Sequence, residues 1–158
     1  MTITPAAPRL SRHLPNGVSL AVYDRSKKLA GDRWLVRLQC EVEVQVGDEF
    51  WLQAGPMEAG LGARIREKIG NILRYHVDQQ RTFVAEADRP TVVAGLLHGI
   101  EASTLPYFEA PRFPAGLFAR RFAECKAQCL AEDRDRAADL AAAAEDDGPA
   151  DFSHCFTD

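Results

Sequence analysis

The residues from Trp34 to Val46 constrain the fold of this chain more than any other feature. Apolar and polar side chains alternate along this stretch without a break. The apolar set is Val36, Leu38, Cys40, Val42, Val44 and Val46, and the polar set is Arg37, Gln39, Glu41, Glu43 and Gln45. Because successive side chains of a β-strand point to opposite faces, the pattern predicts one long strand with a buried face and a solvated face.

Neighbouring segments extend this strand into an antiparallel sheet. Residues 18–24 alternate in the same way, and the turn signal Pro15-Asn16-Gly17 separates them from a short edge strand expected over Arg9–Leu14. The polar connection Arg25–Arg33 is too short for a parallel crossover, so the strands form a meander. Residues 72–84 alternate again and predict a later strand of the same sheet.

A helix is expected over residues 89–104, beginning near Asp88 and Pro90. One side of it carries an apolar stripe, which is Val92, Val93, Leu96, Leu97 and Ile100. The opposite side carries Ala94, Gly95, His98 and Gly99 and no charge. We therefore expect this to be the central helix, packed on the apolar face of the sheet and covered on its other side as well.

The segments on either side of this helix are expected to add two more helices and one loop. Residues 57–69 have apolar residues spaced by four, typical of a short helix. Residues 105–114 hold three prolines among aromatic residues and are expected to form a loop that caps the core. A final helix is expected from about residue 115, with one apolar stripe of Phe118, Phe122, Cys125 and Cys129.

These elements predict an α+β fold: a small antiparallel sheet, made of a meander plus a later strand, packed on one face by the central helix, with a C-terminal helix and an acidic tail. Residues 1–8 are expected to be a disordered N-terminus, residues 9–130 a single domain, and residues 131–158 an acidic, Ala/Asp-rich extension. Residues 132–158 contain nine acidic residues and two arginines, a balance of −7, so the rest of the chain carries +3 of the net −4.

The sequence favours a cytoplasmic location. No apolar run approaches the roughly 20 residues that span a bilayer, and residues 1–14 lack the apolar region of a secretory signal. The four cysteines, Cys40, Cys125, Cys129 and Cys155, are then expected to be free thiols.

Cys125, Cys129, His154 and Cys155 are the best candidates for a structural zinc site. Thiolate and imidazole groups are zinc ligands, and four of them could close a tetrahedral site. However, Cys125 and Cys129 lie on the helical stripe of Phe118 and Phe122, where cysteine serves as a small apolar side chain. We therefore favour core packing for these two residues, and the sequence indicates no cofactor.

The chain contains no recognisable catalytic spacing. Phosphate-binding loops, the nucleophile elbow and the His-Glu-x-x-His helix are all missing from the sequence. An enzyme or small-ligand-binding protein remains an alternative, with a pocket between the sheet and the helices near His98. The pocket candidates are His98, His76, Tyr75 and Tyr107, and we expect any site where the central helix and the aromatic loop meet the sheet.

Nucleic acid is disfavoured as a partner, because sheets that bind RNA present aromatic residues on the exposed face. Here that face carries Arg37, Glu41 and Glu43 instead. The leading hypothesis is a protein-interaction or scaffold domain without catalytic activity, self-associating or binding a partner through the sheet edge or the apolar stripe of the C-terminal helix.

Overall fold

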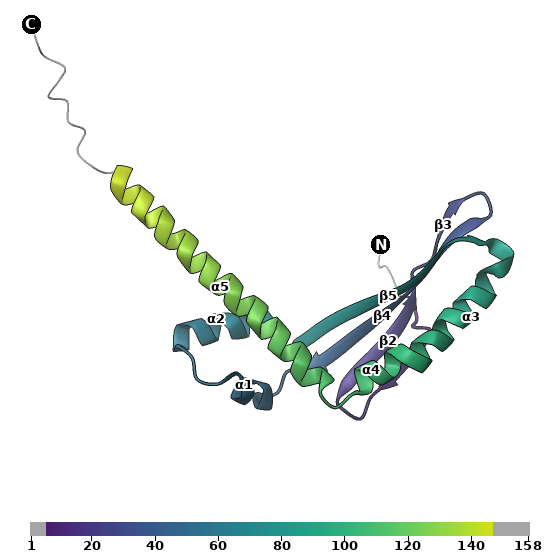
Figure 1. Cartoon of the computed structure of the whole chain (residues 1–158), viewed down its shortest axis with the longest axis horizontal. Coiled ribbons are helices and arrows are strands. Elements are labelled where there is room, and N and C mark those ends of the chain that lie inside the picture. Colours follow the sequence, from purple (N-terminus) through teal and green to yellow (C-terminus); the bar gives the residue numbers. More distant parts are fainter. Residues whose placement is uncertain (1–5, 147–158) are drawn as a thin grey trace, which may run out of the picture.

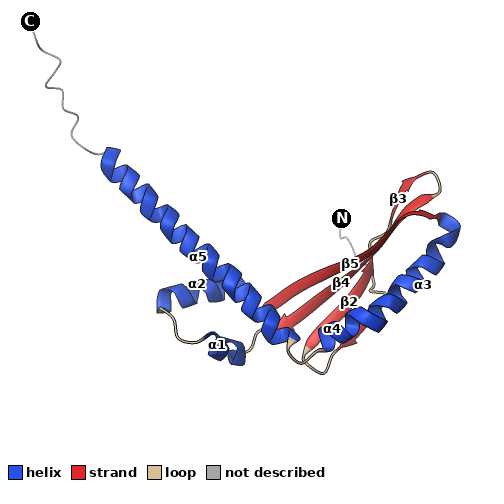
Figure 2. Cartoon of the chain, viewed as in Figure 1, coloured by secondary structure: helices blue, strands red, loops and turns tan. Residues whose placement is uncertain are grey.

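One antiparallel sheet and two groups of helices make up the computed structural model, which describes residues 6–146 (Figure 2). The strands are β1 (Leu10–His13), β2 (Val18–Asp24), β3 (Lys27–Ala30), β4 (Arg33–Gln45) and β5 (Ile72–Ala85). Strand β4 is central: it pairs with β5 along one side and with β2 and β3 along the other. The predicted α+β class with an antiparallel sheet is confirmed.

The register separates the two faces of the sheet as the alternation predicted. On one face, here called the apolar face, the even-numbered β4 residues from Val36 to Val44 are at most 2% exposed. The same face receives Val18, Leu20 and Val22 from β2. The other face, here called the open face, carries Arg37, Gln39, Glu41 and Glu43. Burial of the apolar set drives the pairing, at about 1.5–3 kcal/mol for each fully buried aliphatic side chain.

Helix α3 (Arg89–Gly99) lies across β4 and β5 and covers the apolar face (Figure 1). Its buried residues are Val93 and Leu96, and it continues through a π-helical turn (Ile100–Thr104) into α4 (Leu105–Glu109). The prediction that its other side is also covered is wrong for the described part of the chain. Ala94, Gly95, His98 and Gly99 are exposed there, because alanine, glycine and the polar imidazole of histidine offer little apolar area for another element to bury.

The remaining helices stand at one end of the sheet. They are α1 (Asp48–Ala54), α2 (Ala59–Ile69) and the 34-residue α5 (Phe113–Asp146). Helices α1 and α2 pack against the first half of α5, and the second half projects away from the rest of the protein (Figure 1). Within residues 6–146, no helix combines the length and the hydropathy that crossing a bilayer would require.

Three elements differ from the sequence prediction. Strand β3 forms inside the connection Arg25–Arg33, because Gly31 adopts the positive φ of 56° that a tight hairpin needs. Helix α1 follows β4 directly, and α4 occupies part of the predicted aromatic loop. Pro106 comes just after the π-helical turn Ile100–Thr104, where the regular i→i−4 hydrogen bonds of the helix are already interrupted.

Strand β5 contains a bulge near its end. The register with β4 shifts between Trp34 and Val36, and Phe83 adopts φ 58°. A left-handed conformation is strained for a bulky residue, and 73% of Phe83 is exposed. The part of β5 from Ile72 to Arg81 is regular, and the bulge ends it.

Candidate functional surfaces

The four pocket candidates from the sequence do not converge. Tyr75 lies on the apolar face opposite Val42, whereas the next residue, His76, lies on the open face opposite Glu41. His98 is on the exposed side of α3. Only Tyr75 and Tyr107 are brought together, in a hollow where β5, α4 and α5 meet. This hollow is at the predicted margin of the sheet, but neither histidine lines it.

The hollow has a volume of about 300 Å³ and is lined by aromatic rings with two arginines. Its aromatic part is held by ring contacts of Phe108 with Tyr107 and Phe113, with centroids 5.4 and 5.0 Å apart. Arg112 and Arg120 supply guanidinium groups, and Arg120 lies 3.5 Å from Glu124. Neither a carboxylate nor an imidazole is among its lining residues. The hollow can therefore attract an anionic group but offers no general base.

The backbone around this hollow is fixed by one side chain far away in the sequence. Asn16, in the β1–β2 turn, donates hydrogen bonds from Nδ2 to the carbonyl oxygens of Phe108 and Ala110, at 2.7 and 3.0 Å. These bonds join the first hairpin to the end of α4. Phe108 itself is fully buried, so the predicted role of the aromatic segment as a cap on the core applies to this residue.

A second hollow, of about 460 Å³, lies between the start of α3 and the β1–β2 hairpin. Arg89 places its guanidinium 3.5 Å from the centroid of the Trp34 ring, and Arg9 pairs with Asp24 at 3.1 Å. Burial alone would raise the pKa of Asp24, but hydrogen bonds from Ser26 and the charge of Arg9 lower it overall. Because Asp24 and Glu86 balance the two arginines, this hollow has no excess charge to attract an ion.

One histidine does contact a hydroxyl group. His13 Nδ1 lies 3.0 Å from Ser19 Oγ across the β1–β2 pair. Nucleophilic serines also need an acid that orients the imidazole through its other nitrogen. Glu43 is the cross-strand neighbour of Ser19, on the side away from His13, and it bonds to Arg74 instead. The pair therefore lacks the order of groups that a catalytic triad requires.

The three cysteines in the described part of the chain, Cys40, Cys125 and Cys129, are part of the core. Cys125 and Cys129 are fully buried, while His154 and Cys155, the other two candidate zinc ligands, lie outside the described residues. Within residues 6–146, no three His, Cys, Asp or Glu side chains are grouped so that they could hold a metal ion. Burial, with a smaller contribution from Asp78, raises the pKa of the Cys40 thiol to about 11, so this thiol is not a nucleophile at neutral pH.

The open face of the sheet carries ion pairs between neighbouring strands. Arg37 pairs with Asp78 at 2.5 Å, and Arg74 pairs with Glu43 at 3.2 Å. Both pairs join β4 to β5. Exposed pairs of this kind contribute about 0–1 kcal/mol each to the free energy of unfolding. The open face is therefore a solvated charged surface that adds little to stability.

The apolar stripe of α5 is used inside the chain. Phe118 stacks on Phe50 of α1 with centroids 5.2 Å apart, and Trp51 meets Phe118 edge-on at 5.1 Å. Arg66 of α2 lies over Trp51 at 4.4 Å. The stripe that the sequence suggested for a partner is therefore covered by α1 and α2.

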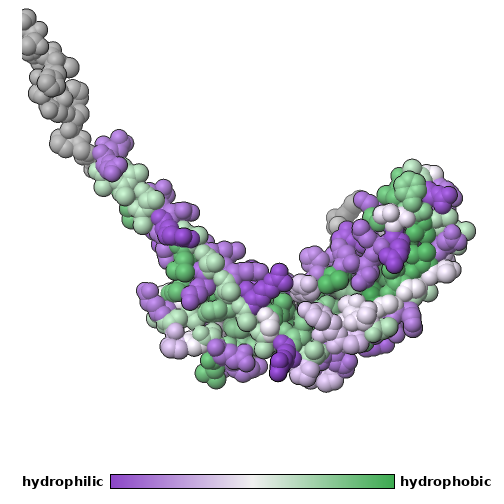
Figure 3. Space-filling view, viewed as in Figure 1, coloured by the Kyte–Doolittle hydropathy of each residue, from purple (hydrophilic) through white to green (hydrophobic). Residues whose placement is uncertain are grey.

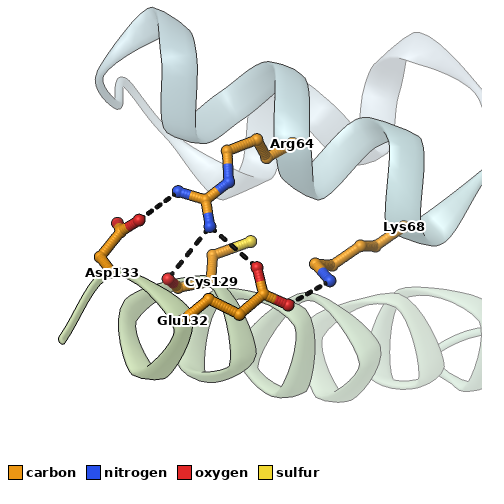
Figure 4. Close-up of polar contacts among 5 residues, drawn as sticks. All are labelled: Arg64, Lys68, Cys129, Glu132 and Asp133. Carbon is orange, nitrogen blue, oxygen red and sulfur yellow. Dashed lines mark hydrogen bonds and ion pairs between the residues drawn. The ribbon is translucent and has the colours of Figure 1, made fainter. Parts of the chain in front are cut away.

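Polar contacts hold α2 to the middle of α5 (Figure 4). Arg64 donates to Asp133 at 2.7 Å, to Glu132 at 2.9 Å and to the carbonyl oxygen of Cys129 at 3.2 Å, and Lys68 donates to Glu132 at 2.8 Å. Hydrogen bonds from Lys68 and Arg64 lower the pKa of Glu132, and the bond to Glu132 raises the pKa of Lys68. We call this group the α2–α5 clamp.

Beyond the clamp, α5 has no support from the described part of the chain. Every residue from Arg134 to Asp146 is exposed, and we call this segment the arm. A second apolar stripe begins beside the clamp and runs along the arm, about a quarter-turn or more away from the buried stripe. Its members are Ala127, Leu130, Ala137, Ala141 and Ala144.

This second stripe is open to solvent. Its only leucine, Leu130, is 45% exposed. A shallow hollow of about 580 Å³ follows the stripe and is lined by Ala127, Leu130, Asp133, Arg134 and Ala137. Figure 3 shows apolar atoms along one side of the projecting helix, between charged groups. This surface was not predicted from the sequence, because alanine marks a helical face only weakly. The recurrence of apolar residues at spacings of three, four and seven was the available signal.

Comparison with known proteins adds no assignment. No protein-family model matches the chain, and neither the curated proteins nor the solved structures contain a significant match.

Proposed function

We propose that this protein is a non-catalytic interaction module that binds a helical segment of another protein along the arm. The observation that carries the proposal is the projection of residues 134–146 as a helix with an open apolar stripe. The sheet and the α2–α5 clamp supply the rigid base from which the arm extends. As part of the same proposal we retain a cytoplasmic location, supported by Cys40, Cys125 and Cys129 being free thiols.

The arm lacks the tertiary contacts that stabilise most helices in proteins. The packed first half of α5 nucleates the helix, but most helical stability comes from the packing of an apolar face. The arm has 13 residues from Arg134 to Asp146, and none of them is buried. A partner that packs on the stripe would supply the missing tertiary contacts.

The composition of the stripe specifies what kind of partner fits. Alanine side chains let the axis of a second helix approach closely, and Leu130 provides apolar contact area. Asp133, Arg134, Asp135 and Arg136 offer charges of both signs beside the stripe. An amphipathic helix with a narrow apolar stripe flanked by mixed charges would match this surface.

The enzyme alternative has weaker support. Of the four sequence-derived pocket residues, the hollow at the end of the sheet brings together only two tyrosines, and it adds no general base. The His13–Ser19 pair lacks an orienting acid. The open apolar stripe of the arm therefore supports a binding function better than these groups support an enzyme.

Affinity capture with the full-length chain tests the proposal. The variant Leu130→Glu places a charge in the stripe at a residue that is already 45% exposed, so the fold should persist. Gln128→Glu adds the same charge on the opposite side of α5 and is the matched control. A host protein retained by the wild type and by Gln128→Glu, but lost with Leu130→Glu, is the expected result. Capture that is equal in all three chains, or absent from the wild type, would refute the proposal.

A further inference from the structure

Strand β5 has a free edge. It is 14 residues long and pairs with β4 on one side, and no described strand pairs with its other side. In Figure 1 this other side faces the open space between α5 and the β3 hairpin. Natural sheets protect such edges with proline, charged side chains (above all lysine), bulges or short strands, because unpaired backbone groups are a template for another strand. Between Ile72 and Arg81, β5 has neither proline nor lysine, and its bulge comes only afterwards.

The hydrogen-bond pattern shows which residues present backbone groups at this edge. Val46 N donates to Asn71 O at 2.9 Å, next to the pair Gln45↔Ile72. In an antiparallel ladder, hydrogen-bonded and non-hydrogen-bonded pairs alternate, so the odd-numbered residues of regular β5 bond to β4. The even-numbered residues direct N–H and C=O groups outward, and they are Ile72, Arg74, His76, Asp78 and Gln80.

A second copy of β5 fits this edge in one register better than in its neighbours. Placing His76 opposite its own symmetry mate pairs Arg74 with Asp78 and Ile72 with Gln80 of the other copy. All five outward residues are then matched, which gives about ten N–H···O=C bonds at two per pair. Moving the register by one permitted step shortens the overlap and removes the Arg74–Asp78 pairing.

The side chains agree with this register on both faces. On the open face, Arg74 and Asp78 of the two copies carry opposite charges across the junction, twice per dimer. On the apolar face, Tyr75 lies opposite Val77 of the other copy in the closely spaced, non-hydrogen-bonded pair. Both side chains are only partly buried in one copy, and an aromatic residue beside a β-branched one is a favourable cross-strand pair.

We propose that the protein forms a two-fold dimer in which the β5 strands of two copies pair antiparallel, centred on His76, into one continuous sheet. This interface is separate from the arm. It would leave both arms available, so each dimer would present two copies of the binding surface proposed above.

Charge complementation in the full-length chain tests the register. Homodimers of Arg74→Asp would place two carboxylates opposite each other at each of these pairs, and homodimers of Asp78→Arg would place two guanidinium groups there. Each variant alone should dimerise about tenfold or more weakly than the wild type. An equimolar mixture should recover the dimer, because in the mixed dimer both pairs join a carboxylate of one chain to a guanidinium group of the other. Sedimentation equilibrium distinguishes the 17.4 kDa chain from its dimer.

A cross-link provides a second readout that does not depend on these charges. In a chain with Cys155→Ser, His76→Cys should form a disulfide between copies, because the two residues at the axis have Cα atoms about 5.5 Å apart. Gln80→Cys is the control: in this register the two residues 80 lie roughly 27 Å apart, eight residues along the strand. The dimer should also persist with Leu130→Glu. A failure of the dimer proposal can therefore be distinguished from a failure of the arm proposal.

Three results would overturn the dimer. One is a wild-type chain that stays monomeric up to about 200 μM, a concentration well above micromolar dissociation constants. Another is a mixture of folded charge variants that stays as monomeric as each variant alone. The third is a wild-type monomer that dimerises only after residues 147–158 are removed, since the edge would then be covered by the chain's own C-terminus.

Discussion

Truncating Phe118 is expected to damage the helical end of the protein far more than truncating Phe83. Phe118 is 2% exposed and its ring meets Phe50, Trp51 and Phe122 with centroids 5.2, 5.1 and 6.0 Å away. Removing a buried phenylalanine to alanine costs about 3–5 kcal/mol, which combines the lost transfer energy with the cavity left behind. Three aromatic pairs place this site in the upper part of that range, since each adds about 0.5–1.5 kcal/mol beyond its area.

Phe83→Ala is the matched control, because it removes the same atoms from a residue that is 73% exposed. Its expected cost is below about 1 kcal/mol, in proportion to the small area that the ring buries. Urea unfolding followed by circular dichroism measures both free energies of unfolding. Costs that are equal within error, or a Phe118→Ala cost below about 1 kcal/mol, would refute the packing described for α1 and α5.

Three further predictions concern strain and titration. Phe83→Gly should be more stable than Phe83→Ala by about 0.5 kcal/mol or more in urea unfolding, because glycine removes the cost of φ 58°; a less stable glycine variant would show that the bulge is unstrained. The free energy of unfolding should fall as the pH rises from about 9 to about 11, since folding raises the pKa of Cys40 and ionisation of the thiol favours the unfolded chain. Cys40→Val should show a smaller fall, and an identical one would contradict this. The α2–α5 clamp should weaken as the pH falls, because the contribution of Glu132 is present in full above the ordinary carboxyl pKa and is lost as the pH falls through the lowered one; the wild type should melt above Glu132→Gln at pH 7 but not in acid, and a constant difference would argue against the clamp.

Strands β2, β4 and β5 were predictable because apolar and polar side chains alternate along each of them, whereas β3 has no such alternation. Strand β4 runs over Arg33–Gln45, against a predicted Trp34–Val46, and β5 over Ile72–Ala85, against 72–84. Helix α3 was predictable from its stripe on one side. Its uncharged outer side led to the wrong expectation of a second covering element. A lack of charge shows that a face can be buried, but the driving force depends on apolar area, which alanine and glycine do not supply.

The candidate sites were harder to predict, because they depend on which elements meet in space. Tyr75 and His76 are neighbours in the sequence but lie on opposite faces of β5. The partner of the Phe118 stripe was hidden in α1, a seven-residue helix with no periodic signal of its own. Once α1 and α2 occupy that stripe, the surface left for a partner is the alanine-rich side of α5, which a sequence pattern marks only weakly.

Photo-cross-linking in the native host tests the central claim, that the arm binds a partner, most directly. A photoreactive benzoylphenylalanine replaces Ala137, which lines the stripe, or Gln128, which lies on the opposite side of the same helix. We predict a discrete covalent adduct with another protein from position 137 and none from position 128. No adduct at position 137, or the same adducts at both positions, would contradict the claim.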